Sequence, residues 1–131
     1  MSKLIHLVDD DAAVRGTLAR LLASGGYEVH QYASGAELLD AADALDGGTV
    51  RLDVDMPEPD GFAVTRMLAE RAIEVPVVMM TGGGDLTLLA FRAGVAQFMQ
   101  KPFGRTELLS VLDALSERPR APFARAARIH A

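Results

Sequence analysis

Short apolar runs alternate with segments of helical periodicity along most of this 131-residue chain, and this alternation is the feature that most constrains its fold. Each run is long enough for one buried strand, and the segment after it carries apolar residues at the spacing of a helix face. Strands and helices that alternate with short links indicate βαβ units, which form a parallel sheet with right-handed crossovers. The sequence therefore predicts an α/β domain of five strands and five helices. The strands are expected at residues 4–8, 28–32, 50–53, 75–80 and 96–99, with 28–32 at an edge because it is less hydrophobic.

Residues that favour helix ends stand at the expected helix boundaries. Asp11 is interpreted as a favourable charge at the start of the first helix, and Ser34 as a cap of the second. Glycines at 25–26 and 47–48 are expected to end these two helices. The second helix is predicted to carry Leu38, Leu39, Ala42 and Leu45; the third opens at 60–61, the fourth spans 85–93 and the last spans 106–117.

The composition limits the possible classes of protein. A chain of this length can bury an adequate core without stabilising cross-links. With 50% hydrophobic but only 5% aromatic residues, that core must be aliphatic. The absence of cysteine excludes disulfides, thiolate metal sites and thiol catalysis. The N-terminus leads directly into a strand and no apolar run approaches membrane-spanning length, so we expect no signal peptide, no membrane span and a cytoplasmic location.

Acidic and basic residues are unevenly distributed. Every Asp and Glu lies at or before Glu117, whereas four arginines follow it. An acidic body argues against direct binding to nucleic acid. We expect one domain over residues 1–117, followed at 118–131 by a basic, proline-containing tail or the start of a linker.

Polar residues stand at the ends of four expected strands. Asp53 ends the third, the acidic stretch 9–11 follows the first, Thr81 follows the fourth and Lys101 follows the fifth. Ligands of an open parallel sheet bind beyond the carboxyl ends of its strands, so these groups are expected to meet in one crevice. Carboxylates, a hydroxyl and an ammonium group gathered there describe a phosphoryl-transfer site with a divalent cation.

The chemistry of such a site assigns a role to each group. The Asp53 carboxylate can attack phosphorus to form an acyl phosphate, while a cation reduces the repulsion between the two anions. Mg²⁺ prefers oxygen ligands and is often held by one or two carboxylates plus phosphate, which Asp9, Asp10 and Asp53 can supply. Lys101 would place its ammonium group over the phosphoryl oxygens, and Thr81 would donate a hydrogen bond to them.

With these motifs in this order, residues 3–117 resemble the receiver domain of two-component response regulators. The resemblance rests on 8–11 (Val-Asp-Asp-Asp), 52–57 (Leu-Asp-Val-Asp-Met-Pro), Asp60-Gly61, Thr81-Gly82, Ala93-Gly94 and 101–103 (Lys-Pro-Phe). It is closest to the subfamily whose receivers precede a helix-turn-helix output domain.

The resemblance implies a doubly wound, flavodoxin-like (βα)5 fold in which Asp53 is the phosphoacceptor. Asp10 would be a direct ligand of Mg²⁺ or Mn²⁺, Asp9 would act through metal-bound water, and the main-chain carbonyl of Asp55 would complete the metal site. Thr81 and Phe98 would be the switch residues, and Lys101 would contact the phosphoryl group. The bond between Lys101 and the following proline would be cis.

The resemblance also implies a signalling domain, with no enzymatic activity beyond its own phosphotransfer and autodephosphorylation. The phosphoryl donor would be a sensor histidine kinase or a phosphotransfer protein. The output partner stays open, and the domain is expected to be a monomer or a weak, phosphorylation-dependent dimer.

Several positions depart from the family pattern. The segment between Thr81 and Ala93 is about two residues shorter than in that subfamily, so the fourth helix is expected to be shorter or rotated. Arg51 stands in the third strand where an apolar residue is expected, and a buried charge there needs an acidic partner or a route to solvent. Asp55 adds an anion at the mouth of the site, and Gly83 supplies no side chain there.

Two alternatives remain open at this stage. In the first, Asp53 and Asp55 form the Asp-x-Asp motif of haloacid-dehalogenase-like phosphatases, with Asp55 as general acid and base. That motif normally follows the first strand, and this chain has no sequence for a substrate-enclosing cap. In the second, the chain is a degenerate receiver that binds partners without being phosphorylated. The three histidines show no ligand spacing, so we expect none to be catalytic or metal-binding.

Overall fold

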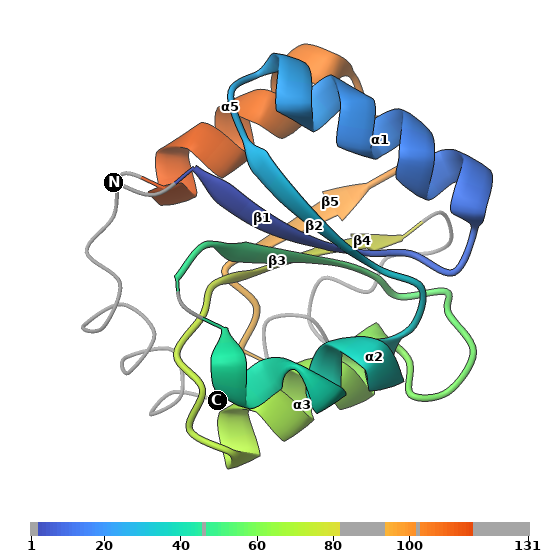
Figure 1. Cartoon of the computed structure of the whole chain (residues 1–131), viewed down its shortest axis with the longest axis vertical. Helices are drawn as coiled ribbons and strands as arrows, with labels where there is room; N and C mark the ends of the chain where they lie inside the picture. The colour runs from blue at the N-terminus through green and yellow to red at the C-terminus, as the bar shows by residue number, and fades with distance from the viewer. Residues whose placement is uncertain (1–2, 46, 82–93, 102, 117–131) are drawn as a thin grey trace.

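A computed structural model describes residues 3–45, 47–81, 94–101 and 103–116, and five strands in these ranges form one parallel sheet (Figure 1). The order across the sheet is β2-β1-β3-β4-β5, and every neighbouring pair is parallel. The α/β prediction is therefore confirmed, and the second strand lies at an edge as expected. The strands are β1 (Leu4–Val8), β2 (Glu28–Tyr32), β3 (Thr49–Asp53), β4 (Val77–Thr81) and β5 (Gln97–Gln100).

The helices cover both faces of the sheet. In Figure 1, α1 and α5 lie on one face and α2 and α3 on the other. The predicted helix 85–93 lies outside the described residues. None of the helices described is long and apolar enough to cross a bilayer. The helical elements are α1 (Ala12–Ser24), α2 (Gly35–Asp40), the 3-10 turn η1 (Ala42–Ala44), α3 (Gly61–Glu70) and α5 (Arg105–Ser116).

Side-chain caps begin three of these helices where the sequence suggested. The Asp11 carboxylate accepts hydrogen bonds from the main-chain N–H groups of the first turn of α1, at 2.9 and 3.1 Å. Ser34 Oγ accepts from the N–H of Glu37, and Asp60 Oδ1 accepts from that of Ala63. These bonds satisfy N–H groups that have no partner within the helix.

The predicted second helix is too long. Regular α-helix ends at Asp40, the chain tightens into η1, and Leu45 is extended, with φ −67° and ψ 120°. The tighter turn directs Leu45 back toward the apolar cluster beneath the sheet, against which it packs. Tertiary packing therefore decides the end of this helix, not the glycines at 47–48.

Strand boundaries also differ from the prediction in β3, which begins one residue earlier at Thr49, and in β4 and β5. β4 begins at Val77 because Pro76 has no N–H to donate to a neighbouring strand; its carbonyl accepts from the N–H of Val50. At the other end Thr81 belongs to the strand, since its carbonyl accepts a 2.7 Å hydrogen bond from the N–H of Lys101. β5 is displaced by one residue from the expected 96–99.

The core consists of two apolar layers, one on each side of the sheet. One is made by strand residues such as Leu7 and Met80 packed on α1 and α5, and the other by residues such as Leu52 packed on α2 and α3. Every residue of β3 and of β4 is buried. Because β3 is central and covered on both faces, any polar side chain in it needs a partner inside the protein.

Candidate phosphorylation site

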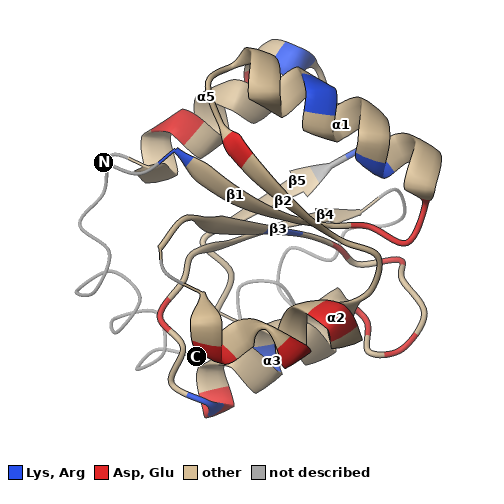
Figure 2. Ribbon diagram, in the orientation of Figure 1, with Lys and Arg blue, Asp and Glu red and all other residues tan. Residues whose placement is uncertain are grey.

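Acidic residues gather at the carboxyl edge of the sheet, in the loops that follow β1 and β3 (Figure 2). The register aligns the ends of the strands: Asp53 of β3 pairs with Met80 of β4, and Thr81 of β4 pairs with Gln100 of β5. Asp9 directly follows β1 and Lys101 directly follows β5. The expected convergence of four strand ends is therefore present.

Asp53 and Lys101 make direct contact. Lys101 Nζ lies 2.5 Å from Asp53 Oδ2, while Asp53 Oδ1 accepts a hydrogen bond from the N–H of Asp55 at 2.9 Å. The Asp53 side chain is only 6% exposed, whereas that of Lys101 is 35% exposed. An almost buried carboxylate with an ammonium group on one oxygen is held in place and remains reachable from the crevice.

Asp9 is buried and paired with Arg51. Arg51 Nη1 lies 2.8 Å from Asp9 Oδ2, and the two side chains are 1% and 3% exposed. The other carboxylate oxygen of Asp9 accepts from the N–H of Asp11 at 2.9 Å. The acidic partner that a charge in the third strand requires is thus Asp9. The sequence signal for this pair was the charge of Arg51 in a largely apolar strand. The sequence did not identify which acidic residue would be its partner.

The two expected switch residues lie on neighbouring strands. Thr81 is completely buried at the end of β4. Phe98 of β5 is half-buried and packs against the small cluster formed by Val54 and Met79. Their strands are adjacent, but no conformational change follows from a single structure, so the switch roles stay predictions.

Asp10 and Asp55, in the loops that follow β1 and β3, are exposed. Within the described ranges, no three His, Asp or Glu side chains are arranged as a ready-made metal cluster. The expected position of Gly83 and the expected cis bond to Pro102 lie outside the described residues.

The donor groups fit a Mg²⁺ ion that retains much of its water. Mg²⁺ is commonly bound by one or two carboxylates plus phosphate oxygens and several waters, and Asp10 and Asp53 can supply two carboxylates. Both oxygens of Asp9 already have protein partners. Asp10 and Asp53 can therefore serve as carboxylate ligands of such an ion, and Asp9 is the least available of the expected ligands.

The first turn of α3 lies directly against the end of β3. A Cβ atom at Gly61 would come within 2.9 Å of the carbonyl oxygen of Asp53 and 3.2 Å of the Cα of Val54. Real Cβ atoms essentially never come within 3.0 Å of such an atom, so the approach to the Asp53 carbonyl favours glycine here. The position of Asp53 is thereby held from the main-chain side as well as by Lys101.

Two histidines lie side by side on β1 and β2, away from the strand ends. His6 pairs in register with His30, and their ring centroids are 5.7 Å apart. His6 Nε2 lies 3.0 Å from the carbonyl oxygen of Gly47, and the Tyr32 hydroxyl is 3.3 Å from its Nδ1. Burial lowers the pKa of His6 and raises that of Tyr32. Neither histidine lies at the carboxyl ends of the strands.

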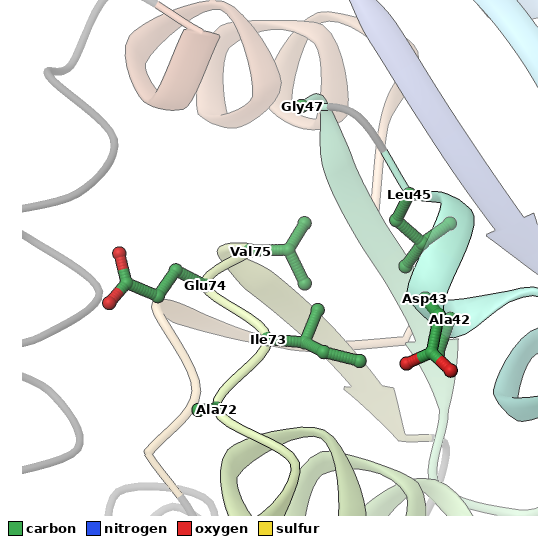
Figure 3. Close-up of a pocket in the computed structure, with 8 residues that line it drawn as sticks. All are labelled: Ala42, Asp43, Leu45, Gly47, Ala72, Ile73, Glu74 and Val75. Carbon is green, nitrogen blue, oxygen red and sulfur yellow. The ribbon is translucent and has the colours of Figure 1, made fainter.

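A pocket of about 340 Å³ opens at the opposite end of the sheet, where Gly47 precedes β3 and Val75 precedes β4. Leu45, Ile73 and Val75 point into it and the Glu74 carboxylate points away (Figure 3). Its lining contains none of the predicted site residues. The predicted phosphorylation site at the strand ends is therefore separate from this pocket.

The model of the response regulator receiver domain family matches residues 5–113, and this chain belongs to that family. Members of the family are signalling domains that use Mg²⁺ at their phosphorylation site. The match favours a phosphorylation-dependent receiver over the phosphatase and the degenerate receiver.

Similar proteins agree with this assignment. The transcriptional regulatory protein FixJ of Azorhizobium caulinodans is 40% identical over 112 residues, covering 84% of this chain and 53% of FixJ. The response regulator TmoT of Ectopseudomonas mendocina is 37% identical over 111 residues, covering 83% of this chain and 50% of TmoT. The chain thus spans about half the length of these curated relatives.

Solved structures share the fold. The crystal structure of FixJ-N has a TM-score of 0.85 at 30% identity, covering 91% of this chain and 97% of that one. The chemotaxis protein CheY4 of Vibrio cholerae has a TM-score of 0.80 at 25% identity, covering 88% and 99%. The predicted doubly wound (βα)5 class is confirmed by these neighbours.

Proposed function

We propose that Asp53 is the phosphoacceptor of this receiver domain. The observation that carries the proposal is the contact between Lys101 Nζ and Asp53 Oδ2, which joins residues 48 positions apart at the end of the central strand. An oxygen of the Asp53 carboxylate attacks the phosphorus of a phosphohistidine, the P–N bond breaks, and the histidine nitrogen leaves with its electron pair. The product is an acyl phosphate on Asp53, which water hydrolyses back to carboxylate and inorganic phosphate.

Neighbouring groups position the phosphoryl group and compensate its charge. The Lys101 ammonium group moves from the free carboxylate to a phosphoryl oxygen, and the Thr81 hydroxyl donates to another. Thr81 and Phe98 then report the phosphorylated state to the adjacent surface. The catalytic part is limited to this self-catalysed transfer and autodephosphorylation.

Mg²⁺, or Mn²⁺ in its place, would be held by Asp10 and Asp53 together with the main-chain carbonyl of Asp55. When bound, the ion supplies positive charge that offsets the repulsion between carboxylate and phosphate. Asp10 is exposed and adjacent to the crevice, which leaves its carboxylate available for this role.

The family also supports a proposal for the phosphoryl donor, the domain bounds and the assembly state. The phosphoryl donor is a sensor histidine kinase or a phosphotransfer protein in the cytoplasm. Residues 1–117 form the receiver and 118–131 a basic tail or the start of a linker, and the domain is a monomer or a weak dimer that contacts neither membrane nor nucleic acid directly. The helix-turn-helix regulators among its relatives support an output partner downstream of the receiver.

Acetyl phosphate tests the proposal without a kinase. The wild-type protein is incubated with acetyl phosphate and Mg²⁺ and analysed by intact-mass and peptide mass spectrometry. We expect one phosphoryl adduct on the peptide containing Asp53, no adduct on Asp53→Asn, and an adduct on the matched control Asp55→Asn. A phosphoryl group on another residue of the wild type would contradict the assignment, and rapid turnover of acetyl phosphate without an adduct would indicate a phosphatase.

A further inference from the structure

Arg51 is a fully buried cation in the central strand. Its neighbours in register are Leu7 on β1 and Val78 on β4, both part of the apolar layer beneath α1 and α5. The side chain is 1% exposed, so the charge has no route to solvent. A buried guanidinium group needs an anion and several acceptors to offset its lost hydration.

The contacts of Arg51 direct its side chain to the end of β1. Nη1 donates to Asp9 Oδ2 at 2.8 Å and to the carbonyl oxygen of Val8 at 3.3 Å, while Nε lies 2.9 Å from Met80 Sδ. The second oxygen of Asp9 accepts from the N–H of Asp11 at 2.9 Å. Each oxygen of the Asp9 carboxylate is therefore engaged by a donor of the protein itself.

We propose that Arg51 is a positioning residue of the metal site, which neutralises Asp9 and withholds its carboxylate from the cation. Asp10 and Asp53 are then the side chains that hold Mg²⁺. This inference rests on the proposed function and revises one part of it, because the family resemblance assigns Asp9 a role through metal-bound water.

Exchange of partners would be unfavourable. If Asp9 turned toward Mg²⁺, Arg51 would remain buried without an anion, and an unpaired buried charge is strongly destabilising. Mg²⁺ would gain less from a third carboxylate than Arg51 would lose, since one or two carboxylates and several waters complete its coordination. Arg51 thus lowers the negative charge available to the ion, and binding is looser than it would be with three free carboxylates.

Three proteins compared by isothermal titration calorimetry with MgCl₂ test the inference. They are the wild type, Arg51→Met, and the double variant Arg51→Met/Asp9→Asn, which replaces the pair by neutral groups of similar size. We expect Arg51→Met to bind Mg²⁺ about tenfold more tightly because Asp9 is released, a change at the lower end of those produced by residues that orient metal ligands. The double variant should return to the wild-type affinity. An unchanged or weaker affinity of Arg51→Met, or a double variant that binds much more weakly than wild type, would overturn the inference.

A measurement on the wild type covers the case in which Arg51→Met does not fold. The Nη1–H signals of Arg51 in a ¹H–¹⁵N NMR spectrum should keep their position and slow solvent exchange at saturating Mg²⁺, because the ion pair between Nη1 and Asp9 persists. Loss of this protection on adding Mg²⁺ would show that Asp9 changes partner and would overturn the inference. The phosphorylation of Asp53 by acetyl phosphate tests the proposed function separately, since that outcome does not depend on which partner Asp9 has.

Discussion

Asp9 and Asp10 are adjacent in the chain, but Asp9 is buried against a buried arginine whereas Asp10 is exposed to solvent. Two carboxylates that look equivalent in the sequence therefore differ in what they do for the protein. One is part of the interior, where it balances the charge of Arg51. The other is an exposed charge in the loop after β1.

This difference predicts opposite effects on stability. Asp9→Asn should lower the free energy of unfolding by about 3 kcal/mol, because it leaves Arg51 buried without its anion. Asp10→Asn should leave stability unchanged or raise it slightly, since it removes repulsion at an exposed site. Urea denaturation in the absence of divalent cations measures both values, and similar effects of the two substitutions would contradict the assignment of Asp9 to the interior.

Replacement of Lys101 should slow phosphorylation of Asp53. Lys101→Met removes the ammonium group that lies on Asp53 Oδ2 and would stabilise the phosphoryl oxygens, so we expect the rate from acetyl phosphate to fall about 100-fold. Lys3→Met is a matched control, because Lys3 is exposed at the start of the chain and contacts Asp113 instead. A Lys101→Met protein that is phosphorylated at the control rate would exclude the proposed contact.

Asp55 is predicted to oppose phosphorylation. Its main-chain N–H donates to Asp53 Oδ1, which places a second acidic residue at the mouth of the site. Asp55→Asn keeps the size and the main chain while removing a negative charge that the phosphoryl group would meet. We expect a higher rate or a higher plateau of phosphorylation at matched Mg²⁺ and ionic strength. Equal kinetics would show that the Asp55 charge is screened by solvent.

His6 should make folding stability depend on pH. Burial, assisted by the charge on His30, lowers its pKa from the usual 6.5, while Glu28 and the hydrogen bond to Gly47 oppose the shift. Below about pH 6.5 the unfolded chain therefore binds a proton that the folded protein does not, so stability falls as the pH drops toward the folded pKa.

Urea midpoints measured from about pH 8 to about pH 5 check this dependence. His6→Gln should flatten the profile in that range, because glutamine does not titrate and can still donate to the Gly47 carbonyl. His30→Gln is the matched control on the neighbouring strand and should retain the decline below the usual histidine pKa. A decline of equal size in His6→Gln would assign the effect to other groups.

The sequence predicted the parts of the structure that local chemistry decides. Asp11, Ser34 and Asp60 began helices as expected, because a short side-chain acceptor can satisfy the free N–H groups of a first turn in any surrounding. The alternation of strands and helices predicted the sheet. Because groups at the carboxyl ends of parallel strands lie at the same edge of a sheet, the sequence also predicted that Asp53 and Lys101 lie close together.

Other parts depended on contacts that no local pattern contains. The end of α2 is decided by the packing of Leu45 against the layer beneath the sheet, so its periodicity alone suggested a longer helix. The partner of Arg51 could not be chosen from sequence, since three consecutive acidic residues stand at 9–11. Only the register of β1 against β3, which pairs Leu7 with Arg51, shows that Asp9 is the acid within reach.

The contact of Gly61 with the carbonyl of Asp53 has a consequence for the length of the loop between them. The two ends of residues 54–60 are held together at their base, so the loop is a closed bulge whose outer residues, Asp55, Pro57 and Glu58, are exposed. Extra residues inserted after Pro57 would extend outward from this base, and doubling the loop length would cost only about 0.6 kcal/mol of closure entropy. An insertion at the exposed tip of the loop would therefore leave the strand that carries Asp53 in place.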